Sequence, residues 1–243
     1  MKKKITKLIA NILFFILPKK ILNFIAYLDG YRYFKISYSQ SAEDLILLKY
    51  LKYRKIKKGK YLDIGAFHPR WISNTHLLHK KGFSGYCIDL DEEKLRWFKF
   101  ARGEKVKTIC GAVSDTNEKF INFYKFIRKS PFSAIDTCSL ENAEYFKKKT
   151  NMNYEITKVR NYHINEIFMM VGKIDVLNID IEGKDFEFLK SSNLEIADPE
   201  IVLIEDQSSY FAKEELVSFF KKKNYNLLST CGLTKIFAKK KNI

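Results

Sequence analysis

The sequence has few cysteines, arginines and prolines, and no long hydrophobic run. The four cysteines form no CxxC pair, and Cys87 and Cys110 lie in strand-like runs. We therefore expect buried free thiols in a reducing compartment, not a disulfide framework or a zinc site. The apolar run from Leu8 to Leu17 has about half of the ~20 residues that a bilayer-spanning helix needs, and no small-residue cleavage site follows it, which argues against a signal peptide.

Basic residues, by contrast, are abundant. The 243 residues carry a net charge of +16, with 37 lysines against 7 arginines. A nucleic acid or an anionic membrane is one explanation for this charge, and a compositional bias of the source genome is the other. Specific phosphate recognition relies on the arginine fork, so the scarcity of arginine favours the second explanation and argues against nucleic acid as a partner.

Residues 1–30 differ from the rest of the chain. Lysines precede the first apolar run, and a second apolar run from Ile21 to Leu28 follows Pro18. This pattern predicts an N-terminal helical extension of two short basic amphipathic helices, lying on a membrane surface or packed on the domain or a partner subunit. We expect a cytoplasmic protein, peripheral on the inner face of the membrane if the first alternative holds. The sequence does not indicate an oligomeric state.

Residues 31–243 alternate between strand and helix patterns and make one domain. Strands are predicted at 60–64, 85–90, 106–113, 174–181, 201–204, 225–229 and 235–238. Helices are predicted at 73–81, 92–101, 164–171, 185–189 and 213–223. Residues 119–126 suggest a hairpin or edge strand, and 128–153 a variable lid with a short helix near 141–149. This order predicts a doubly wound α/β sheet that binds ligands at the carboxyl ends of its strands.

The stretch YLDIGAFHPRWISNT (61–75) resembles a nucleotide-binding turn that lacks two of its glycines. Asp63 and Gly65 end the first predicted strand, and Gly65 would allow a ligand close to the backbone. Ser73 or Asn74 would cap the following helix, whose first amides could bind a carboxylate. Asp89 ends the second strand, where a carboxylate accepts hydrogen bonds from a ribose diol. Together these positions predict an adenosine-containing cofactor.

The missing glycines discriminate between adenosine cofactors. A dinucleotide pyrophosphate needs the full glycine fingerprint, which Phe67, His68 and Pro69 interrupt. S-adenosylmethionine has no phosphate and ends in an amino acid, so it tolerates bulkier residues in the turn. The sequence therefore favours S-adenosylmethionine.

Three blocks of sequence together resemble one enzyme family. They are YLDIGAFHPRWISNTHLLHKKGFSGYCID, GAVSD and DVLNIDIEGKDFEFLK, with SYSQSAEDLIL upstream. The combination, over roughly 37–206, is similar to the FkbM-type S-adenosylmethionine-dependent methyltransferases. The resemblance implies a seven-stranded, mostly parallel, Rossmann-like class I methyltransferase sheet. It also implies an O-methyltransferase whose acceptor is a sugar, glycan or glycolipid-type molecule.

The resemblance also implies roles for particular residues. The methionine end of the cofactor would lie beside Asp63, Gly65 and Ala66, with Ser73, Asn74 and Thr75 closing the turn. Asp89 would hold the ribose, and the adenine would lie between Ala112, Val113, Ser114 and Asp115. Asp180 would face the transferable methyl group. Phe67 stands where relatives usually have Asn, a departure from the pattern.

Catalytic and metal candidates follow the fourth and fifth predicted strands. A hydroxyl nucleophile must lose its proton to a base or through a metal, and Asp180 and Glu182 are the candidate groups. Asp180 with Glu205 and Asp206 resembles the site of Mg²⁺-dependent O-methyltransferases, and oxygen ligands suit Mg²⁺. The alternative is that Glu205 or Asp206 caps a strand or pairs with a lysine.

The histidines have both functional and structural interpretations. His68 is a base or substrate contact, or else a loop residue packed on Pro69. His76 and His79 lie three apart on one helix without a visible third metal ligand, which favours a surface role, and His163 is expected near a helix cap.

Two other classes of protein remain alternatives: an RNA methyltransferase and a non-catalytic, membrane-associated S-adenosylmethionine-binding scaffold. The sequence DIEG after the fourth strand is not a base-flipping motif, which argues against the first. The acceptor pocket would be shaped by 128–153 and 207–211.

Overall fold

A computed structural model of the chain describes residues 16–127, 132, 135–181, 185–206 and 213–240. It divides into two units, one ending at Ile36 and the other beginning at Ser37. The predicted boundary after residue 30 thus lies within the first unit. The second unit contains both sheets and every site discussed below.

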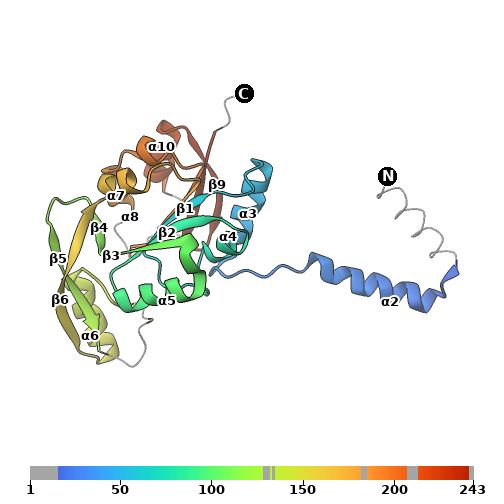
Figure 1. Cartoon of the computed structure of the whole chain (residues 1–243), viewed down its shortest axis with the longest axis horizontal. Helices are drawn as coiled ribbons and strands as arrows, with labels where there is room; N and C mark the ends of the chain where they lie inside the picture. Colours follow the sequence, from blue (N-terminus) through green and yellow to red (C-terminus); the bar gives the residue numbers. More distant parts are fainter. Residues whose placement is uncertain (1–15, 128–131, 133–134, 182–184, 207–212, 241–243) are drawn as a thin grey trace. The chain divides into compact units, whose positions relative to one another are not determined.

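A seven-stranded sheet is the centre of the second unit (Figure 1). Its order is β3-β2-β1-β7-β8-β10-β9. The strands are β1 (Lys60–Ile64), β2 (Ser84–Asp89), β3 (Val106–Cys110), β7 (Val176–Ile179), β8 (Ile201–Glu205), β9 (Tyr225–Cys231) and β10 (Thr234–Lys239). Within this described sheet β10 alone runs in the opposite direction to the other six strands. The predicted doubly wound, mostly parallel sheet is confirmed.

Helices cover both faces of this sheet, because its central strands are apolar on both sides. One core contains Leu62, Leu177 and Val202 and packs against α7 (Ile164–Val171), α8 (Asp185–Lys190), α9 (Leu194–Ala197) and α10 (Glu214–Lys222). The other contains the alternate residues Tyr61 and Val176 and packs against α3 (Glu43–Tyr53), α4 (His76–Lys80) and α5 (Glu92–Arg102). Because successive side chains of a strand point to opposite faces of the sheet, each central strand contributes residues to two separate cores.

A second sheet of three strands, in the order β4-β6-β5, lies beside the carboxyl end of β3 (Figure 1). Its strands are β4 (Ala112–Ser114), β5 (Phe120–Phe126) and β6 (Tyr154–His163), and α6 (Leu140–Thr150) precedes β6. β6 pairs with β4 in parallel and with β5 antiparallel. The hairpin or edge strand expected at 119–126 is therefore β5, paired with a strand that the sequence did not predict.

The prediction of one continuous strand over 106–113 is wrong. The strand breaks at Gly111, whose φ is 153°, and continues as β4 in the second sheet. A Cβ at Gly111 would lie 2.6 Å from the carbonyl oxygen of Arg160, so only glycine allows this close approach. The thiol prediction is also partly wrong, because Cys87 is buried but Cys110 is exposed.

The predicted helix 73–81 begins later than expected, at His76. Neither Ser73 nor Asn74 caps it, because both side chains bind other parts of the domain. Thr75 occupies the N-cap position without a side-chain cap hydrogen bond. By contrast His163 is the N-cap of α7, as expected, and its Nδ1 accepts from the amide of Asn165.

The first unit contains α2 (Lys19–Asp29) and a 3₁₀ turn, η1 (Gly30–Tyr33). No residue of α2 is buried, and its apolar side chains Ile21, Phe24, Ile25 and Leu28 are exposed. Within the described residues, no helix is long and apolar enough to span a membrane. The first of the two predicted helices falls on residues 1–15, outside the described part.

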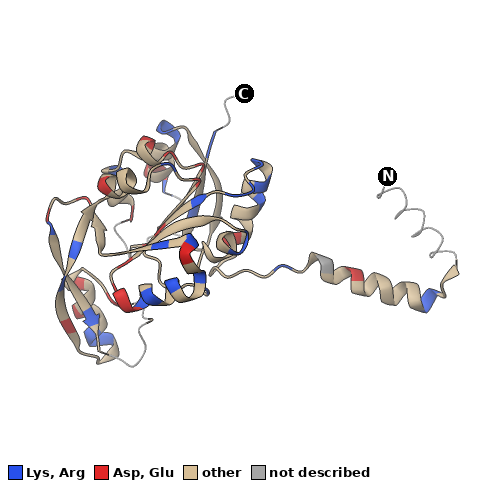
Figure 2. Ribbon diagram, viewed as in Figure 1, with Lys and Arg blue, Asp and Glu red and all other residues tan. Residues whose placement is uncertain are grey.

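Lysines and arginines occur on helices of both faces of the main sheet and on the second sheet (Figure 2). They alternate there with acidic residues, as on α5, where Arg96 lies 3.8 Å from Glu92 one turn away. The high net charge is therefore spread over many elements. The two cavities described below differ from this mixture, because each is lined mainly by charges of one sign.

Candidate active site

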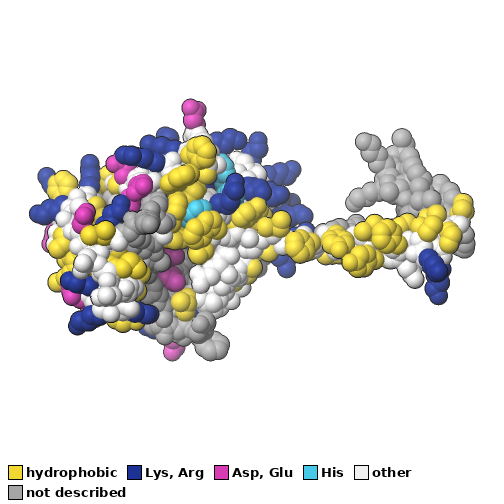
Figure 3. Space-filling view, turned by 90° about the horizontal axis from the view of Figure 1, so that it is seen from below, with side chains coloured by type: hydrophobic (Ala, Val, Ile, Leu, Met, Phe, Trp, Pro, Cys, Tyr) yellow, Lys and Arg dark blue, Asp and Glu magenta, His cyan; other side chains and the backbone are white. Residues whose placement is uncertain are grey.

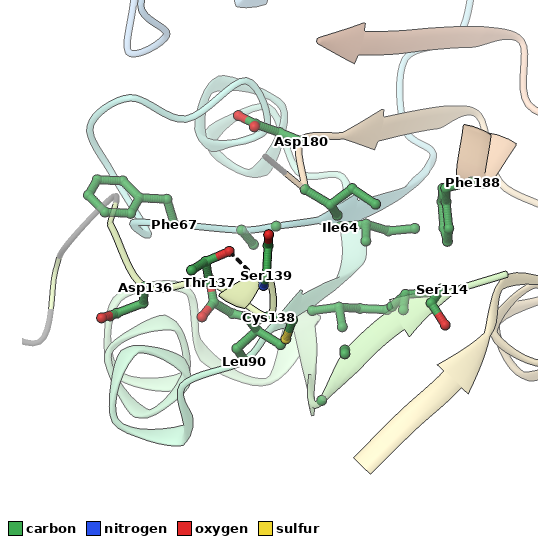
Figure 4. A pocket seen from close by; sticks show the side chains of 18 of the residues that line it. Ile64, Phe67, Leu90, Ser114, Asp136, Thr137, Cys138, Ser139, Asp180 and Phe188 are labelled. Carbon is green, nitrogen blue, oxygen red and sulfur yellow. Dashed lines mark hydrogen bonds between the residues drawn. The ribbon is translucent and has the colours of Figure 1, made fainter. Parts of the chain in front are cut away.

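A cavity of about 1560 Å³ opens at the carboxyl ends of β1, β2, β7 and β8. Parallel α/β sheets bind ligands at this edge. Single small-molecule pockets measure about 300–1,000 Å³, so this cavity has room for a cofactor and an acceptor together. Figure 4 shows Phe67 and Asp136 toward one end of it, and Ser114 and Phe188 toward the other.

The predicted cofactor residues come together around this cavity. Those that line it are Asp63, Gly65, Ala66, Ser73, Asn74, Asp89, Ala112, Val113, Ser114 and Asp115. Thr75 does not line it but donates a hydrogen bond to Oδ2 of Asp63. These positions come from four separate stretches of chain, and the sheet order explains why they meet.

Asp63 is held by two hydrogen bonds at the end of β1. Besides the hydroxyl of Thr75, Nδ2 of Asn178 on β7 donates to Oδ1 of Asp63 at 2.8 Å. Asn74 in turn donates to Oδ1 of Asn178 at 2.9 Å. Burial raises the pKa of Asp63 above its ordinary value. This chain of side chains joins the turn after β1 to the neighbouring strand.

Gly65 is required by the protein backbone rather than by a ligand. Its φ is 82°, and a Cβ there would lie 1.7 Å from the carbonyl oxygen of Asp180. The amides of Gly65 and Ala66 both donate to the carbonyl of Ile88, at 3.0 and 2.9 Å. The turn is therefore fixed between β2 and the residue that follows β7.

Arg102, at the end of α5, makes several hydrogen bonds to the same turn. The buried guanidinium donates to the carbonyl of Pro69 at 2.9 Å, to Ser73 Oγ at 2.8 Å and to Thr75 Oγ1 at 2.9 Å. It also donates to the hydroxyl of Tyr61 at 3.0 Å. Sequence reasoning missed this residue, although an arginine in an arginine-poor chain was a usable signal.

Asp89 lies at the end of β2 beside a buried lysine. Nζ of Lys94 is 3.7 Å from Oδ1 of Asp89 and 3.9 Å from Oδ2 of Asp136. Burial raises the pKa of Asp89 to about 6, against the lowering effect of Lys94 and of the hydrogen bond from the Asp91 amide. Lys94 and Asp136 line the cavity and were not predicted.

His68 belongs to an aromatic cluster at the mouth of the cavity. Its ring lies 4.1 Å from Trp71 and 4.3 Å from Phe132, and Phe67 lies 6.3 Å from Phe132. Nδ1 of His68 accepts the amides of Arg70 and Trp71, both at 3.1 Å, so this nitrogen is not available as a base. Burial, with Arg102 and Arg70, lowers the pKa of His68 to about 4. The imidazole is therefore neutral at physiological pH.

The loop that carries this cluster contains an unusual backbone conformation. Ile72 has φ of 50°, a region that β-branched residues rarely enter because of steric strain. Its side chain lines the cavity, and the next amide, that of Ser73, donates to the carbonyl of Tyr38 at 2.9 Å. Strain of this kind concentrates at functional sites.

The catalytic and metal candidates are only partly brought together. Asp180 and Glu205 line the cavity, and Glu182 lies outside the described residues. Asp206 does not line it; its amide donates to the carbonyl of Leu233. Both Glu205 and Asp206 act electrostatically on the ammonium of buried Lys235. Within the described ranges no three His, Cys, Asp or Glu side chains gather to hold a metal ion, so the expected Mg²⁺ site is not supported.

The cavity is strongly acidic although the protein is basic. Nine carboxylate side chains and two lysines, Lys94 and Lys158, line it. Such a lining attracts cations and disfavours phosphates. A cavity with these charges suits a ligand that carries a sulfonium and an ammonium group.

The sheet order and the ligand-sized cavity at its carboxyl edge define a Rossmann-like class I methyltransferase fold. The methyltransferase FkbM domain model matches residues 63–227, and the chain belongs to this family. Membership makes the chain a methyltransferase, and S-adenosylmethionine is the methyl donor that this fold implies. The resemblance noted in the sequence is confirmed.

Comparison with solved structures gives weak similarities. A putative RNA methyltransferase from Pyrococcus horikoshii is 14% identical over 81% of this chain and 82% of its own, with a TM-score of 0.40. A TehB-like methyltransferase from Corynebacterium glutamicum is 10% identical over 92% and 100%, with a TM-score of 0.38. TehB from Haemophilus influenzae is 14% identical over 83% and 64%, with a TM-score of 0.39. No curated protein matches the chain.

Proposed function

We propose that the chain transfers a methyl group from S-adenosylmethionine to a hydroxyl of a sugar, glycan or glycolipid-type acceptor. The observation that carries this proposal is the composition of the cavity lining. Carboxylates at the edge of the main sheet, among them Asp63, Asp89 and Asp180, line the cavity together with Phe67 and His68. Polar side chains from the second sheet and the start of α6 complete the lining.

The edge of the main sheet fits the cofactor. Asp89 would accept hydrogen bonds from the ribose, since burial leaves its carboxylate without competing solvent. Asp63, Gly65, Ala66, Ser73 and Asn74 would lie beside the amino acid end, whose ammonium the acidic lining favours. Ala112 to Asp115, on and after β4, would flank the adenine. Bound there, S-adenosylmethionine supplies a methyl group attached to a cationic sulfur.

The remaining lining residues fit a polyhydroxylated acceptor. Asn122 and Lys158 from the second sheet, and Ser139, Glu141 and Asn142 around the start of α6, contribute polar groups to the cavity lining. Phe67 and His68 contribute aromatic rings to it and contact Trp71 and Phe132. The carbon–hydrogen face of a sugar ring packs on such rings, while its hydroxyls need hydrogen-bond partners.

The chain's own contribution to the chemistry is positioning and proton removal. Holding the acceptor hydroxyl in line with the methyl group supplies much of the rate of a displacement. Asp180 is the base that we favour, because it follows β7 and lines the cavity. Its carboxylate would take the proton of the acceptor hydroxyl as the new carbon–oxygen bond forms. His68 would contact the acceptor ring, because its Nδ1 is already occupied.

The acidic lining also bears on the RNA alternative. An RNA acceptor would bring phosphates next to nine carboxylates, which would repel them. A neutral sugar avoids this repulsion. We therefore favour the sugar over the RNA acceptor on electrostatic grounds.

The proposal is tested by incubating the purified chain with methyl-labelled S-adenosylmethionine and separate panels of sugars, glycans, glycolipids and RNA. We expect label on a carbohydrate hydroxyl. Label on RNA alone would show that the acceptor is RNA and not a carbohydrate. Absence of cofactor binding in a calorimetric titration would instead point to a scaffold without catalysis.

We also propose that the N-terminal extension, residues 1–30, contacts a membrane surface at the inner face. The exposed apolar side chains of α2 (Ile21, Phe24, Ile25 and Leu28) and the lysines around them suit an interfacial helix. A glycolipid-type acceptor would then be reached at the same surface.

A further inference from the structure

A second, smaller pocket of about 480 Å³ has the opposite electrostatic character to the large cavity. Its lining comes from the segment before α3, the turn after β1, α4 and the end of α5 with the following residues. These lining residues are Tyr38, Arg70, His76, His79, Lys80, Gly82, Ala101 and Lys105. None of them carries a carboxylate. The pocket therefore gathers positive charge without an acidic partner of its own.

The three cationic side chains of this pocket have no carboxylate partner in the described part of the chain. Arg70, Lys80 and Lys105 form no ion pair with any carboxylate among the described residues. Lys80 donates instead to the hydroxyl of Tyr38 at 2.8 Å, which fixes its ammonium at the pocket. Converging like charges repel one another, and an anion bound between them would relieve that repulsion.

The two histidines add directed hydrogen-bond donors. Nδ1 of His76 and Nδ1 of His79 are buried without a hydrogen-bond partner in the described part of the chain. An N–H on Nδ1 would be a buried donor without a partner, whereas an N–H on Nε2 can be paired by an anion in the pocket, so in the site proposed below the proton of each neutral ring lies on Nε2. No hydrogen bond from a described residue engages Nε2 of either ring. Neither Nε2 is among the buried atoms that lack a partner, so the Nε2 of each ring is accessible from the open pocket.

The rings are held in this arrangement by packing. His76 lies edge-on to Tyr38 at 4.5 Å and is stacked with His79 at 6.3 Å. Burial, followed by Arg102 and the other nearby cations, lowers the pKa of His76 to about 4 and also lowers that of His79. Both rings are neutral N–H donors at physiological pH. Figure 3 shows histidine side chains beside lysine and arginine side chains on one face of the molecule.

We propose that this pocket binds a phosphoryl group, held by Arg70, Lys80 and Lys105 together with the Nε2–H groups of His76 and His79. A tetrahedral oxyanion offers several acceptor oxygens to converging donors, and a guanidinium matches two of them at once. The pocket exceeds the volume of one phosphate, so it can also take part of the molecule that carries it. Soluble phosphates and the headgroups of anionic lipids share this chemistry. The site is separate from the methyl-transfer cavity and does not depend on the acceptor proposed for it.

The test follows the imidazole nitrogens of the full chain by two-bond ¹H–¹⁵N correlation spectra during titration with inorganic phosphate and with pyrophosphate. We expect saturable shifts of His76 and His79 while His163 stays unchanged. The double variant Arg70→Gln/Lys105→Gln should weaken binding at least ~10-fold, the loss of two charge-assisted contacts. The control Lys221→Gln/Lys222→Gln removes the same charge from α10 and should leave binding within a factor of about two, because distant exposed charges are screened.

Equal weakening by both double variants would overturn the proposal, because phosphate binding would then depend on the net charge of the protein and not on this pocket. The lipid source is tested with phosphatidylcholine vesicles with and without phosphatidic acid. Vesicle binding that needs phosphatidic acid together with Arg70 and Lys105 supports the phosphoryl site and assigns it to a headgroup. A short single-stranded RNA is tested in the same way. If it binds with the same dependence on Arg70 and Lys105, while inorganic phosphate, pyrophosphate and the vesicles do not bind, the pocket is a nucleic-acid site and the proposal is wrong. Since these readouts do not use S-adenosylmethionine, failure here leaves the methyltransferase proposal intact.

Discussion

Arg102 and Thr75 are joined by a hydrogen bond of 2.9 Å from the guanidinium to the threonine hydroxyl, and that hydroxyl donates onward to Asp63. The end of α5 thus determines the position of a carboxylate at the end of β1. The two elements are separated in sequence by the whole turn that lines the cavity. One buried side chain therefore contributes several of the hydrogen bonds that hold that turn.

Replacing Arg102 by methionine should therefore destabilise the fold by about 3–5 kcal/mol, because the polar groups it satisfies would remain buried without partners. Urea unfolding followed by circular dichroism measures this loss. Arg96→Met is the matched control on the same helix: Arg96 is 72% exposed and its ion pair with Glu92 is solvated, so the change should stay within about 0.5 kcal/mol. Similar losses from both variants would contradict the assigned role.

Gly65→Ala should prevent the turn after β1 from forming as described. The added Cβ would lie 1.7 Å from the carbonyl of Asp180 in addition to the unfavourable positive φ. We expect a loss well above the ~1 kcal/mol that positive φ alone costs. Gly172→Ala separates the two effects, since Gly172 has φ of 71° and a Cβ added there would meet no described atom within 4 Å. Thermal unfolding should show a much smaller change for Gly172→Ala; equal changes would show that conformation alone matters.

The affinity for S-adenosylmethionine should fall as the pH drops through about 6. Burial raises the pKa of Asp89 to about 6, and only the ionised carboxylate accepts two hydrogen bonds from a ribose. Calorimetric titration between pH 5 and pH 8, about one to two units either side of this pKa, measures the dependence. Asp89→Asn should bind weakly at every pH with a flat profile. An unchanged pH dependence in that variant would remove Asp89 from the cofactor site.

The same carboxyl group should affect stability with the opposite sign. Its folded-state pKa lies above the ordinary value of 3.8, so the unfolded chain releases the proton first as the pH rises. Stability contributed at this position is therefore fully present below the ordinary pKa of 3.8 and is lost as the pH rises through about 6, by about 3 kcal/mol at most. Urea unfolding of the native chain and of Asp89→Asn at about pH 3.5 and about pH 7, on either side of this range, isolates this contribution.

Asp180→Asn should keep cofactor binding and lose turnover. The amide preserves the shape of the side chain but cannot take a proton from the acceptor, and general-base contributions are typically about 10²–10⁴-fold. Binding is measured by calorimetry, and turnover with labelled cofactor on an acceptor from the panel above. If turnover stays within a factor of about two, far below that range, another group removes the proton.

The double variant Phe24→Asp/Ile25→Asp should weaken the binding of the chain to anionic vesicles. Both side chains are exposed on α2, and charged residues in place of apolar ones remove the area that an interfacial helix buries. Co-sedimentation with vesicles measures binding. Trp97→Asp/Phe100→Asp, which also removes two exposed aromatic or apolar side chains but from α5, is the control and should leave vesicle binding unchanged.

The main sheet could be predicted from sequence because its strands are short apolar runs buried on both faces, such as 201–204. β6 could not, since half of its residues are exposed, only one is buried and its pattern lacks clear alternation. The break at Gly111 was also invisible, because nothing in the run from Val106 to Val113 shows that its end pairs with β6. Pairing with a distant strand determines that boundary.

The same limit applies to the site. Asp63 and Asp89 were found because each lies near the end of a predicted strand, and sheet order brings strand ends together. Lys94 and Arg102 are contributed by a helix, and their partners lie in other stretches of chain. Asn178 carried a local signal, a polar residue in an apolar strand, that points to a buried hydrogen bond.

The second sheet is assembled from one uninterrupted stretch, from Ala112 to His163. This stretch supplies the lining residues proposed for the adenine, Ala112 to Asp115, and most of those proposed for the acceptor, while Asp63, Asp89 and Asp180 lie outside it. One exchange of coding sequence beyond Asp115 can therefore replace those acceptor residues and leave the three carboxylates untouched. Diversification within such a scaffold requires no change to the seven strands that form its centre.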